Sequence, residues 1–123
     1  MMARIGDMCV GEAVSAFPFR HLNEFTVAKD PLSEPVAVTV MEANHLGRLT
    51  PKAPVFLYHS VLDELIPFAT AQKLQADWCR GGHVTLYADP LSEHSSLAAS
   101  GAPLAVGYLG SRFAGIPVPD NCP

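Results

Sequence analysis

Residues 58–67 read Tyr-His-Ser-Val-Leu-Asp-Glu-Leu-Ile-Pro (YHSVLDELIP) and stand where the character of the sequence changes. A short apolar run, residues 55–57, comes just before them, and a segment with helical spacing follows. Short apolar runs that begin at a proline and end at turn residues are typical of buried strands. The stretch therefore predicts a strand that ends in a tight turn carrying His59, Asp63 and Glu64.

Strand and helix signals alternate downstream of this turn. An amphipathic pattern that includes Leu74 and Trp78 predicts a helix, and Gly81-Gly82 marks its end because glycine is common just past a helix. A second apolar run and a long final helical pattern follow, although Gly101 weakens the latter. Alternating strands and helices are typical of a parallel α/β sheet. The expected elements are a strand at 55–58, a helix at 68–80, a strand at 83–87, a loop at 89–96, a helix at 97–113 and a proline-rich tail at 115–123.

The N-terminal part of the chain favours helices, although residues 36–41 could be strand or helix by propensity. Apolar residues at helical spacing favour a first helix, which Phe17-Pro18-Phe19 ends. Ser33 is the expected N-cap of a second helix, and Pro35 fits its first turn. The expected boundaries are 1–16 for the first helix, 36–41 with an end near 44–47 for the second, 1–47 for the helical segment and 48–123 for the α/β segment.

The composition excludes several classes of function. The chain has 123 residues, 49% of them apolar, which suits one globular domain with a modest core. The net charge is −4 and the basic residues are scattered, so no basic stripe supports binding to nucleic acid. No apolar run is long enough for a membrane span. Asp7 and Glu12 interrupt the place where a signal peptide needs its apolar centre, so the sequence as it stands predicts no export signal.

Three cysteines, Cys9, Cys79 and Cys122, leave the redox state open. Their wide spacing does not match the close pairs of zinc sites. A disulfide between Cys79 and Cys122 would hold the C-terminal tail and leave Cys9 without a partner in the chain. Three reduced thiols are the alternative, and the spacing does not decide between the two.

Asp63 and His94 are the candidate catalytic residues. Each follows one of the two predicted strands, and in a parallel α/β sheet functional residues lie beyond the carboxyl ends of strands. Successive crossover units would bring these two loops side by side. A carboxylate next to a histidine fixes the imidazole tautomer and stabilises the imidazolium during acid–base catalysis. The plainer alternative is an aspartate that bonds turn amides and a histidine on the surface.

A wider set of residues resembles the C-terminal part of the secretory lipases of the lipase A type, which are α/β-hydrolases. The resemblance covers most of residues 40–122 and extends more weakly to the helix around Cys9, which is similar to the end of the cap region in that family. The residues that carry it are Asn44, Leu46, Gly47, the stretch from Pro54 to Pro67 with Tyr58-His59 and Asp63-Glu64, Trp78-Cys79, Gly81, Val84, Glu93-His94, Arg112-Phe113, Gly115 and Cys122.

This resemblance implies a catalytic role for two residues. Asp63 matches the acid of the family's Ser-Asp-His triad and His94 matches its base. Glu64 and Glu93 flank them without an implied catalytic role, and His59 is expected to brace the loop. Ser60 departs from the family, which commonly has glycine after that histidine, so we expect a strained or reshaped turn there. The resemblance also implies an extracellular location, a lipid or ester substrate, and no cofactor or metal.

The nucleophile of such a triad is not recognisable in the sequence. The serine of an α/β-hydrolase sits in a G-x-S-x-G motif, which this chain lacks, and it precedes the Asp and His in chain order. The expected position is therefore upstream of Met1, together with the central strands and the oxyanion hole. We accordingly expect negligible ester hydrolysis by these residues alone. We also expect dimerisation or aggregation through an exposed sheet edge, unless the missing N-terminal half is supplied.

Other functions remain open on the sequence. A peptidase or carboxylesterase of the α/β-hydrolase superfamily would place its Asp and His in the same way. A truncated interaction module without activity would explain the absent serine. A metal site built from His59, Asp63 and His94 is chemically allowed but is the weakest alternative.

Overall fold

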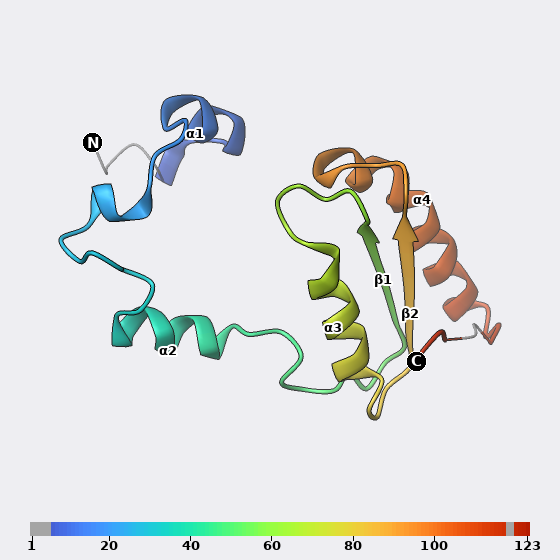
Figure 1. Cartoon of the computed structure of the whole chain (residues 1–123). Helices are drawn as coiled ribbons and strands as arrows, with labels where there is room; N and C mark the ends of the chain where they lie inside the picture. The colour runs from blue at the N-terminus through green and yellow to red at the C-terminus, as the bar shows by residue number, and fades with distance from the viewer. Residues whose placement is uncertain (1–5, 118–119) are drawn as a thin grey trace. The chain divides into compact units, whose positions relative to one another are not determined.

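The computed structural model describes residues 6–117 and 120–123. The chain divides into two compact units, Met1–Asn44 and His45–Pro123 (Figure 1). The units meet between residues 44 and 45, and the sequence places the boundary between its helical and α/β segments between residues 47 and 48.

The described residues of the first unit include the short α-helices α1 and α2 and the 3-10 helix η2. Helix α1 spans Val10–Ala16, the 3-10 helix η2 spans Leu22–Phe25, and α2 spans Pro35–Ala43. The expected N-cap at Ser33 is wrong, because Glu34 takes the N-cap position and Pro35 is the first helical residue. A proline suits this place since its missing N–H has no acceptor in a first turn anyway.

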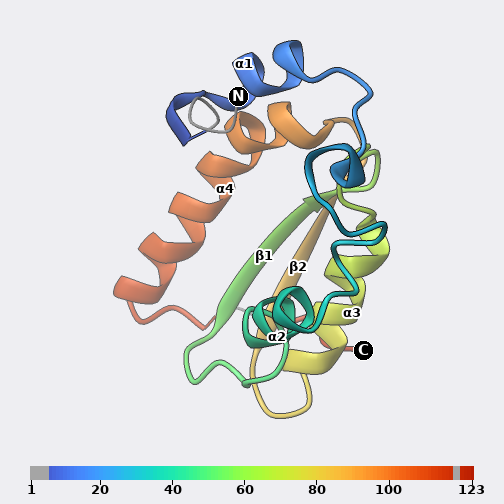
Figure 2. The same cartoon turned by 90° about the vertical axis from the view of Figure 1, so that its left-hand side faces the viewer.

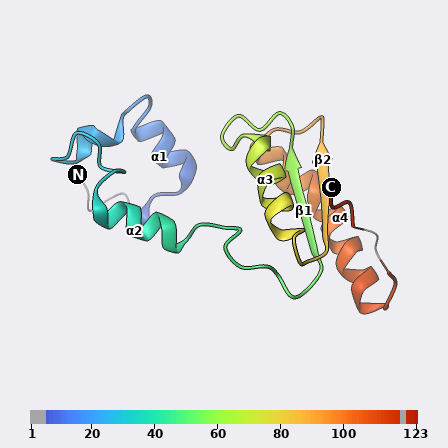
Figure 3. The same ribbon diagram turned by 60° about the horizontal axis from the view of Figure 1, so that its bottom comes forward.

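The second unit has the predicted α/β architecture. Strand β1, Val55–Ser60, and strand β2, Val84–Asp89, are parallel neighbours (Figure 3). Val55 pairs with Val84. Helix α3, Phe68–Trp78, joins the strands, and helix α4, His94–Phe113, follows β2. Figure 2 shows α3 and α4 on opposite faces of the sheet. The unit is thus mixed α/β with strands and helices in alternation, consistent with part of an α/β-hydrolase fold.

Helix α4 begins earlier than the sequence predicts. The expected loop over 89–96 ends at Glu93, and His94 is the first helical residue instead of a loop residue. The cause is the N-cap: the Glu93 carboxylate accepts hydrogen bonds from the amides of Ser95 at 2.8 Å and Ser96 at 2.6 Å. A side chain that satisfies amides of the first turn fixes the start of a helix.

The core of the second unit is small. Among the described residues, the buried apolar side chains belong to Ala71, Val84, Leu86 and Leu97. Many large apolar residues lie at the surface instead, including Leu62 at 59% and Leu65 at 67% exposure. The exposure of so many apolar groups therefore marks surfaces suited to contact with further protein or with an apolar ligand.

Gly101 lies where α4 crosses strand β1. It is a buried residue of α4, and a Cβ built on it would stand 2.5 Å from Cε2 of the Tyr58 ring. Real Cβ atoms do not approach aromatic carbons so closely, so any side chain here would push the helix from the strand. The glycine that weakens the helical pattern in the sequence thus serves the packing of α4 on β1.

Replacing Gly101 by alanine should destabilise the second unit by about 1–3 kcal/mol, since the added methyl group overpacks the contact with Tyr58. The matched control is Gly107→Ala in the same helix, where a Cβ meets nothing within 4 Å. There alanine should stabilise the helix by up to about 1 kcal/mol. Urea unfolding of both variants measures the difference. Equal free energies of unfolding would contradict the close packing.

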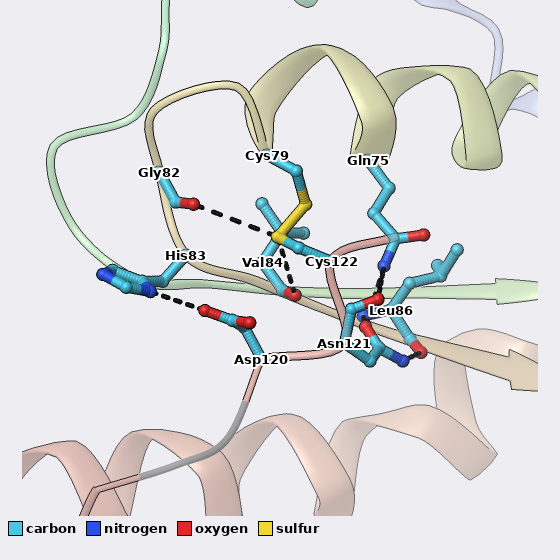
Figure 4. The surroundings of a disulfide bond; sticks show 9 residues. All are labelled: Gln75, Cys79, Gly82, His83, Val84, Leu86, Asp120, Asn121 and Cys122. Atoms are coloured by element: carbon cyan, nitrogen blue, oxygen red, sulfur yellow. Dashed lines mark hydrogen bonds and ion pairs between the residues drawn. A yellow bond between two sulfur atoms is a disulfide. The ribbon is translucent and has the colours of Figure 1, made fainter.

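The C-terminal tail is fastened to α3 and to the outer edge of β2. A disulfide joins Cys79 at the end of α3 to Cys122, so the pairing left open by the sequence is this one (Figure 4). Cys9 is free and exposed. The Asn121 backbone N–H donates to the Val84 carbonyl at 3.2 Å. The Asn121 side chain accepts from the Leu86 N–H and donates to the Leu86 carbonyl, both at 2.8 Å. The amide of Asn121 therefore pairs with β2 in the manner of a neighbouring strand.

None of the helices in the described part of the chain has the length and apolar character that crossing a bilayer requires.

Candidate active site

Asp63 lies in the turn that follows β1. Its Oδ1 accepts hydrogen bonds from the amides of Leu65 at 2.9 Å and Ile66 at 2.7 Å. An aspartate that bonds amides two and three residues further on closes an Asx-type turn and is held in one orientation. The side chain is only 4% exposed. The local sequence thus presents a carboxylate that is fixed and shielded at the end of the strand.

His94 lies at the corresponding place beyond β2, as the first residue of α4. Its backbone N–H donates to Oε2 of Glu64 at 3.3 Å, which ties the start of the helix to the turn after β1. The side chain is 37% exposed, so the ring is partly open to solvent. The hydrogen bond to Glu64 and the N-cap at Glu93 therefore fix the backbone that carries the imidazole.

The structure brings the two predicted residues together. His94 Nδ1 lies 2.9 Å from Asp63 Oδ2 and 3.2 Å from Oδ1. An ionised carboxylate only accepts hydrogen bonds, so Nδ1 carries the proton and donates it. Nε2 is then the basic nitrogen of the ring. This is the geometry and tautomer in which a carboxylate orients a histidine that acts as general base.

The ionisation of Asp63 is set by its hydrogen bonds. Burial raises the pKa of the carboxyl, but the bonds from the Ile66 amide and the His94 ring outweigh burial and lower the pKa to about 2. Hydrogen bonds to the charged form stabilise it, as expected for a carboxylate with several donors. Asp63 is therefore ionised throughout the neutral range.

The ionisation of His94 shifts in the opposite direction. The hydrogen bond to Asp63 raises the pKa of the imidazole above its ordinary value of 6.5, and the opposing effect of burial is smaller. The charges of Glu64 and Glu93 raise the pKa further. The pair thus favours the imidazolium, the form that a general base reaches after it has taken a proton.

These shifts predict a pH dependence of stability. A raised folded-state pKa means that His94 stabilises the fold fully below pH 6.5, and this contribution is lost as the pH rises through the folded-state value. A lowered pKa means that Asp63 stabilises the fold above its ordinary value of 3.8, and this is lost as the pH falls towards about 2. In Asp63→Asn we expect the His94 pKa to fall, as measured by NMR titration of the ring. In the same variant, the free energy of unfolding measured with urea should fall less as the pH drops from 3.8 towards about 2.

Asp77→Asn is the control for the histidine titration, because Asp77 pairs with Lys73 at 2.7 Å and has no contact with His94. A His94 pKa that stays the same in Asp63→Asn would contradict the coupling of the two groups.

His59 and Glu64 support the pair through different contacts. His59 Nδ1 lies 2.9 Å from the Ser60 carbonyl oxygen, and its Nε2 lies 3.8 Å from Asp63 Oδ2. This agrees with the expected bracing role at the strand end. Glu64 holds the backbone of His94 by the hydrogen bond given above.

A buried polar network behind the pair was not anticipated from the sequence. The Ser60 hydroxyl donates to the Ser92 carbonyl and accepts from the Leu62 N–H at 2.9 Å. The Asp89 carboxylate accepts from the amides of Leu91 at 2.8 Å and Ser92 at 3.0 Å. The signal in the sequence was Asp89-Pro90-Leu91-Ser92, a typical Asx-turn pattern.

The reshaped turn expected at Ser60 is not found as backbone strain. Ser60 is the last residue of β1, and Phe19 is the one non-glycine residue with a positive φ in residues 6–117 and 120–123. The serine fits the strand end because its hydroxyl finds partners on both sides. A small buried side chain at this position can therefore be polar without cost from an unmade hydrogen bond.

The described residues contain no cluster of three or more His, Cys, Asp or Glu side chains suited to holding a metal ion. What Asp63 and His94 form instead is an oriented acid–base pair at the carboxyl ends of two parallel strands. Such a pair can accept and return a proton at Nε2, and it needs a nucleophile next to that nitrogen to perform covalent chemistry.

Comparison with known proteins gives the family. A model of secretory lipases matches residues 1–121. The chain belongs to the secretory lipase family. This confirms the resemblance carried by the stretch from Tyr58 to Pro67 and by Glu93-His94.

The relatives of this secretory lipase chain are longer proteins. Secreted triacylglycerol lipase LIP5 of Malassezia furfur is 30% identical over 90% of this chain and 31% of its own length. Lipase 5 of Candida albicans is 34% identical over 80% of the chain and 22% of its own length. A Mycobacterium tuberculosis protein named "Probable inactive lipase MT1628" is 32% identical over 98% of the chain and 28% of its own length. The chain thus matches a C-terminal fraction of lipases and spans under a third of each.

Proposed function

We propose that this chain supplies Asp63 and His94 as the acid and base of a Ser-Asp-His triad in a secreted ester hydrolase that acts on triacylglycerols. The observation that supports this most directly is the hydrogen bond of 2.9 Å between His94 Nδ1 and Asp63 Oδ2. The pair lies beyond the carboxyl ends of β1 and β2, where α/β-hydrolases carry these two groups. The names of relatives such as the Malassezia furfur lipase support an acylglycerol substrate and an extracellular location.

In this proposal the nucleophile and oxyanion hole come from sequence outside residues 1–123. His94 Nε2 removes the proton from a serine hydroxyl as the serine attacks the ester carbonyl, and it then returns a proton to the leaving alcohol. Asp63 stays ionised and stabilises the imidazolium. Residues 1–47 then belong to the end of the cap region and residues 48–123 to the end of the catalytic domain.

A chimaeric lipase tests the proposal. In this chimera the 123 residues replace the matching C-terminal part of the Malassezia furfur lipase, which retains its own upstream sequence. We expect the chimera to hydrolyse tributyrin, and we expect the 123-residue chain alone to give negligible turnover because it has no serine on a nucleophile elbow. A correctly folded chimera without turnover would overturn the proposal. So would turnover by the chain alone that is lost in His94→Ala.

The second candidate is a non-catalytic member of the family. The match to the protein named "Probable inactive lipase MT1628" over 98% of the chain favours it. The same chimera separates the two, because a non-catalytic C-terminal part would fold against the upstream sequence but leave the ester intact.

A further inference from the structure

Asp63 lies in the loop after β1, and His94 begins α4 directly after the loop that follows β2. The distance between the two side chains therefore depends on how these two loops are held together. The loop after β1 is fixed internally by the Asp63 carboxylate, which binds the amides of Leu65 and Ile66. The loop after β2 is fixed internally by Asp89 in the same manner. Two loops that are each rigid still need a connection if a hydrogen bond between them is to persist.

The Ser60 hydroxyl makes such a connection. It donates to the backbone carbonyl of Ser92 in the loop after β2. It accepts at 2.9 Å from the N–H of Leu62 in the loop after β1. Leu62 directly precedes Asp63, and Ser92 lies two residues before His94. One hydroxyl group therefore joins the backbone on both sides of the acid–base pair.

The connection is sealed from solvent. Ser60 has 0% exposure and is one of the two largest side chains that are fully buried in the described residues. Hydrogen bonds in such surroundings are stronger than in water, and a group left without its partner there cannot be satisfied by a water molecule. A backbone hydrogen bond also joins the ends of the two strands, because the Val61 N–H donates to the Asp89 carbonyl at 2.8 Å.

We propose that Ser60 is a positioning residue for the candidate acid–base pair: its buried hydroxyl locks the loop of Asp63 to the loop that precedes His94 and so maintains the bond between carboxylate and imidazole. This deepens the proposed function and rests on it for its catalytic meaning. Ser60 does not contact a reacting atom in this role. It acts through Leu62 and Ser92 on the separation of the two loops.

NMR of the 123-residue chain tests the lock without substrate or nucleophile. Two quantities are measured in wild type and in Ser60→Ala: the hydrogen-exchange rate of the Leu62 amide and the pKa of the His94 ring. In Ser60→Ala we expect the Leu62 amide to exchange at least about tenfold faster, because it loses its acceptor. We also expect the His94 pKa to fall towards its ordinary value, because the bond to Asp63 loosens.

Ser111→Ala is the matched control. It removes a hydroxyl that donates to the Gly107 carbonyl at 3.0 Å, and it lies about 25 Å along α4 from His94. Both quantities should stay as in wild type. Faster exchange at Leu62 with an unchanged His94 pKa in Ser60→Ala would overturn the proposal, since Ser60 would then be structural only. An unchanged Leu62 rate would overturn it as well.

Should the alanine chain fail to fold, exchange in the wild-type chain decides. The proposal requires a slowly exchanging Leu62 amide, and exchange at the rate of an unstructured amide would refute it. Because these readouts involve no turnover, an inactive chimera with an intact response of His94 would reject the proposed function and leave the lock standing. An active chimera without that response would do the reverse.

Discussion

His94→Ala in the chimaeric lipase should lower kcat for tributyrin by about 10⁵-fold or more, and Asp63→Asn should lower it by about 10⁴-fold. Alanine at 94 removes the base that takes the proton of the serine. Asparagine at 63 keeps the shape of the acid but removes the charge that fixes the Nδ1 tautomer and stabilises the imidazolium. The double variant should be little worse than His94→Ala alone, since members of a triad act as a unit.

Two substitutions of the same chemical type control for damage to the fold. His83→Ala removes an exposed histidine that pairs with Asp120 at 2.5 Å on the tail, and Asp77→Asn removes a carboxylate paired with Lys73. Both chimeras should keep kcat within about threefold of the parent, because the changes lie away from the acid–base pair. A loss below tenfold in His94→Ala would contradict the assignment of the base.

Loss of the disulfide should have the largest effect on stability. The bond joins Cys79 to Cys122 across a sequence separation of 43 residues. Closing a loop of this length restricts the unfolded chain by about 4 kcal/mol in the chain-entropy treatment, within the usual range of about 2–5 kcal/mol. Urea unfolding of Cys79→Ser/Cys122→Ser should show this loss. It is a large share of the roughly 5–15 kcal/mol that stabilises most domains.

Cys9→Ser is the control for the disulfide prediction, because Cys9 is free and exposed. Its free energy of unfolding should stay within about 0.5 kcal/mol of wild type. If the double serine variant were as stable as Cys9→Ser, the tail would not depend on the covalent bond.

The order of the elements could be predicted because the apolar runs differ clearly in length and spacing. The strands at 55–60 and 84–89 and the helices that follow them came within a few residues of their expected bounds. The pairing of Asp63 with His94 followed from the topology, since neighbouring parallel strands end at one edge of the sheet. Their catalytic role stays a prediction until the chimera is assayed.

Other features depend on contacts that spacing does not encode. Helix α4 starts at His94 because Glu93 acts as the N-cap, a role that serine, threonine, aspartate and asparagine fill more often. The disulfide was undecided because two cysteines 43 residues apart carry no information on their separation in space. The hydrogen bond of the Ser60 hydroxyl could not be predicted, because its acceptor is the backbone carbonyl of Ser92, a group that every residue has.

Asn121 determines on which edge of the sheet a further strand can add. An uncovered strand is a template on which a further chain can add by backbone pairing. At β2 that template is already used by Asn121, which the neighbouring Cys122 anchors covalently to α3. A further strand would have to displace Asn121 before it could pair with β2. Asn121 binds Val84 through its backbone N–H and Leu86 through two hydrogen bonds of its side-chain amide. Strand addition is therefore directed to β1, the other strand of this two-stranded sheet.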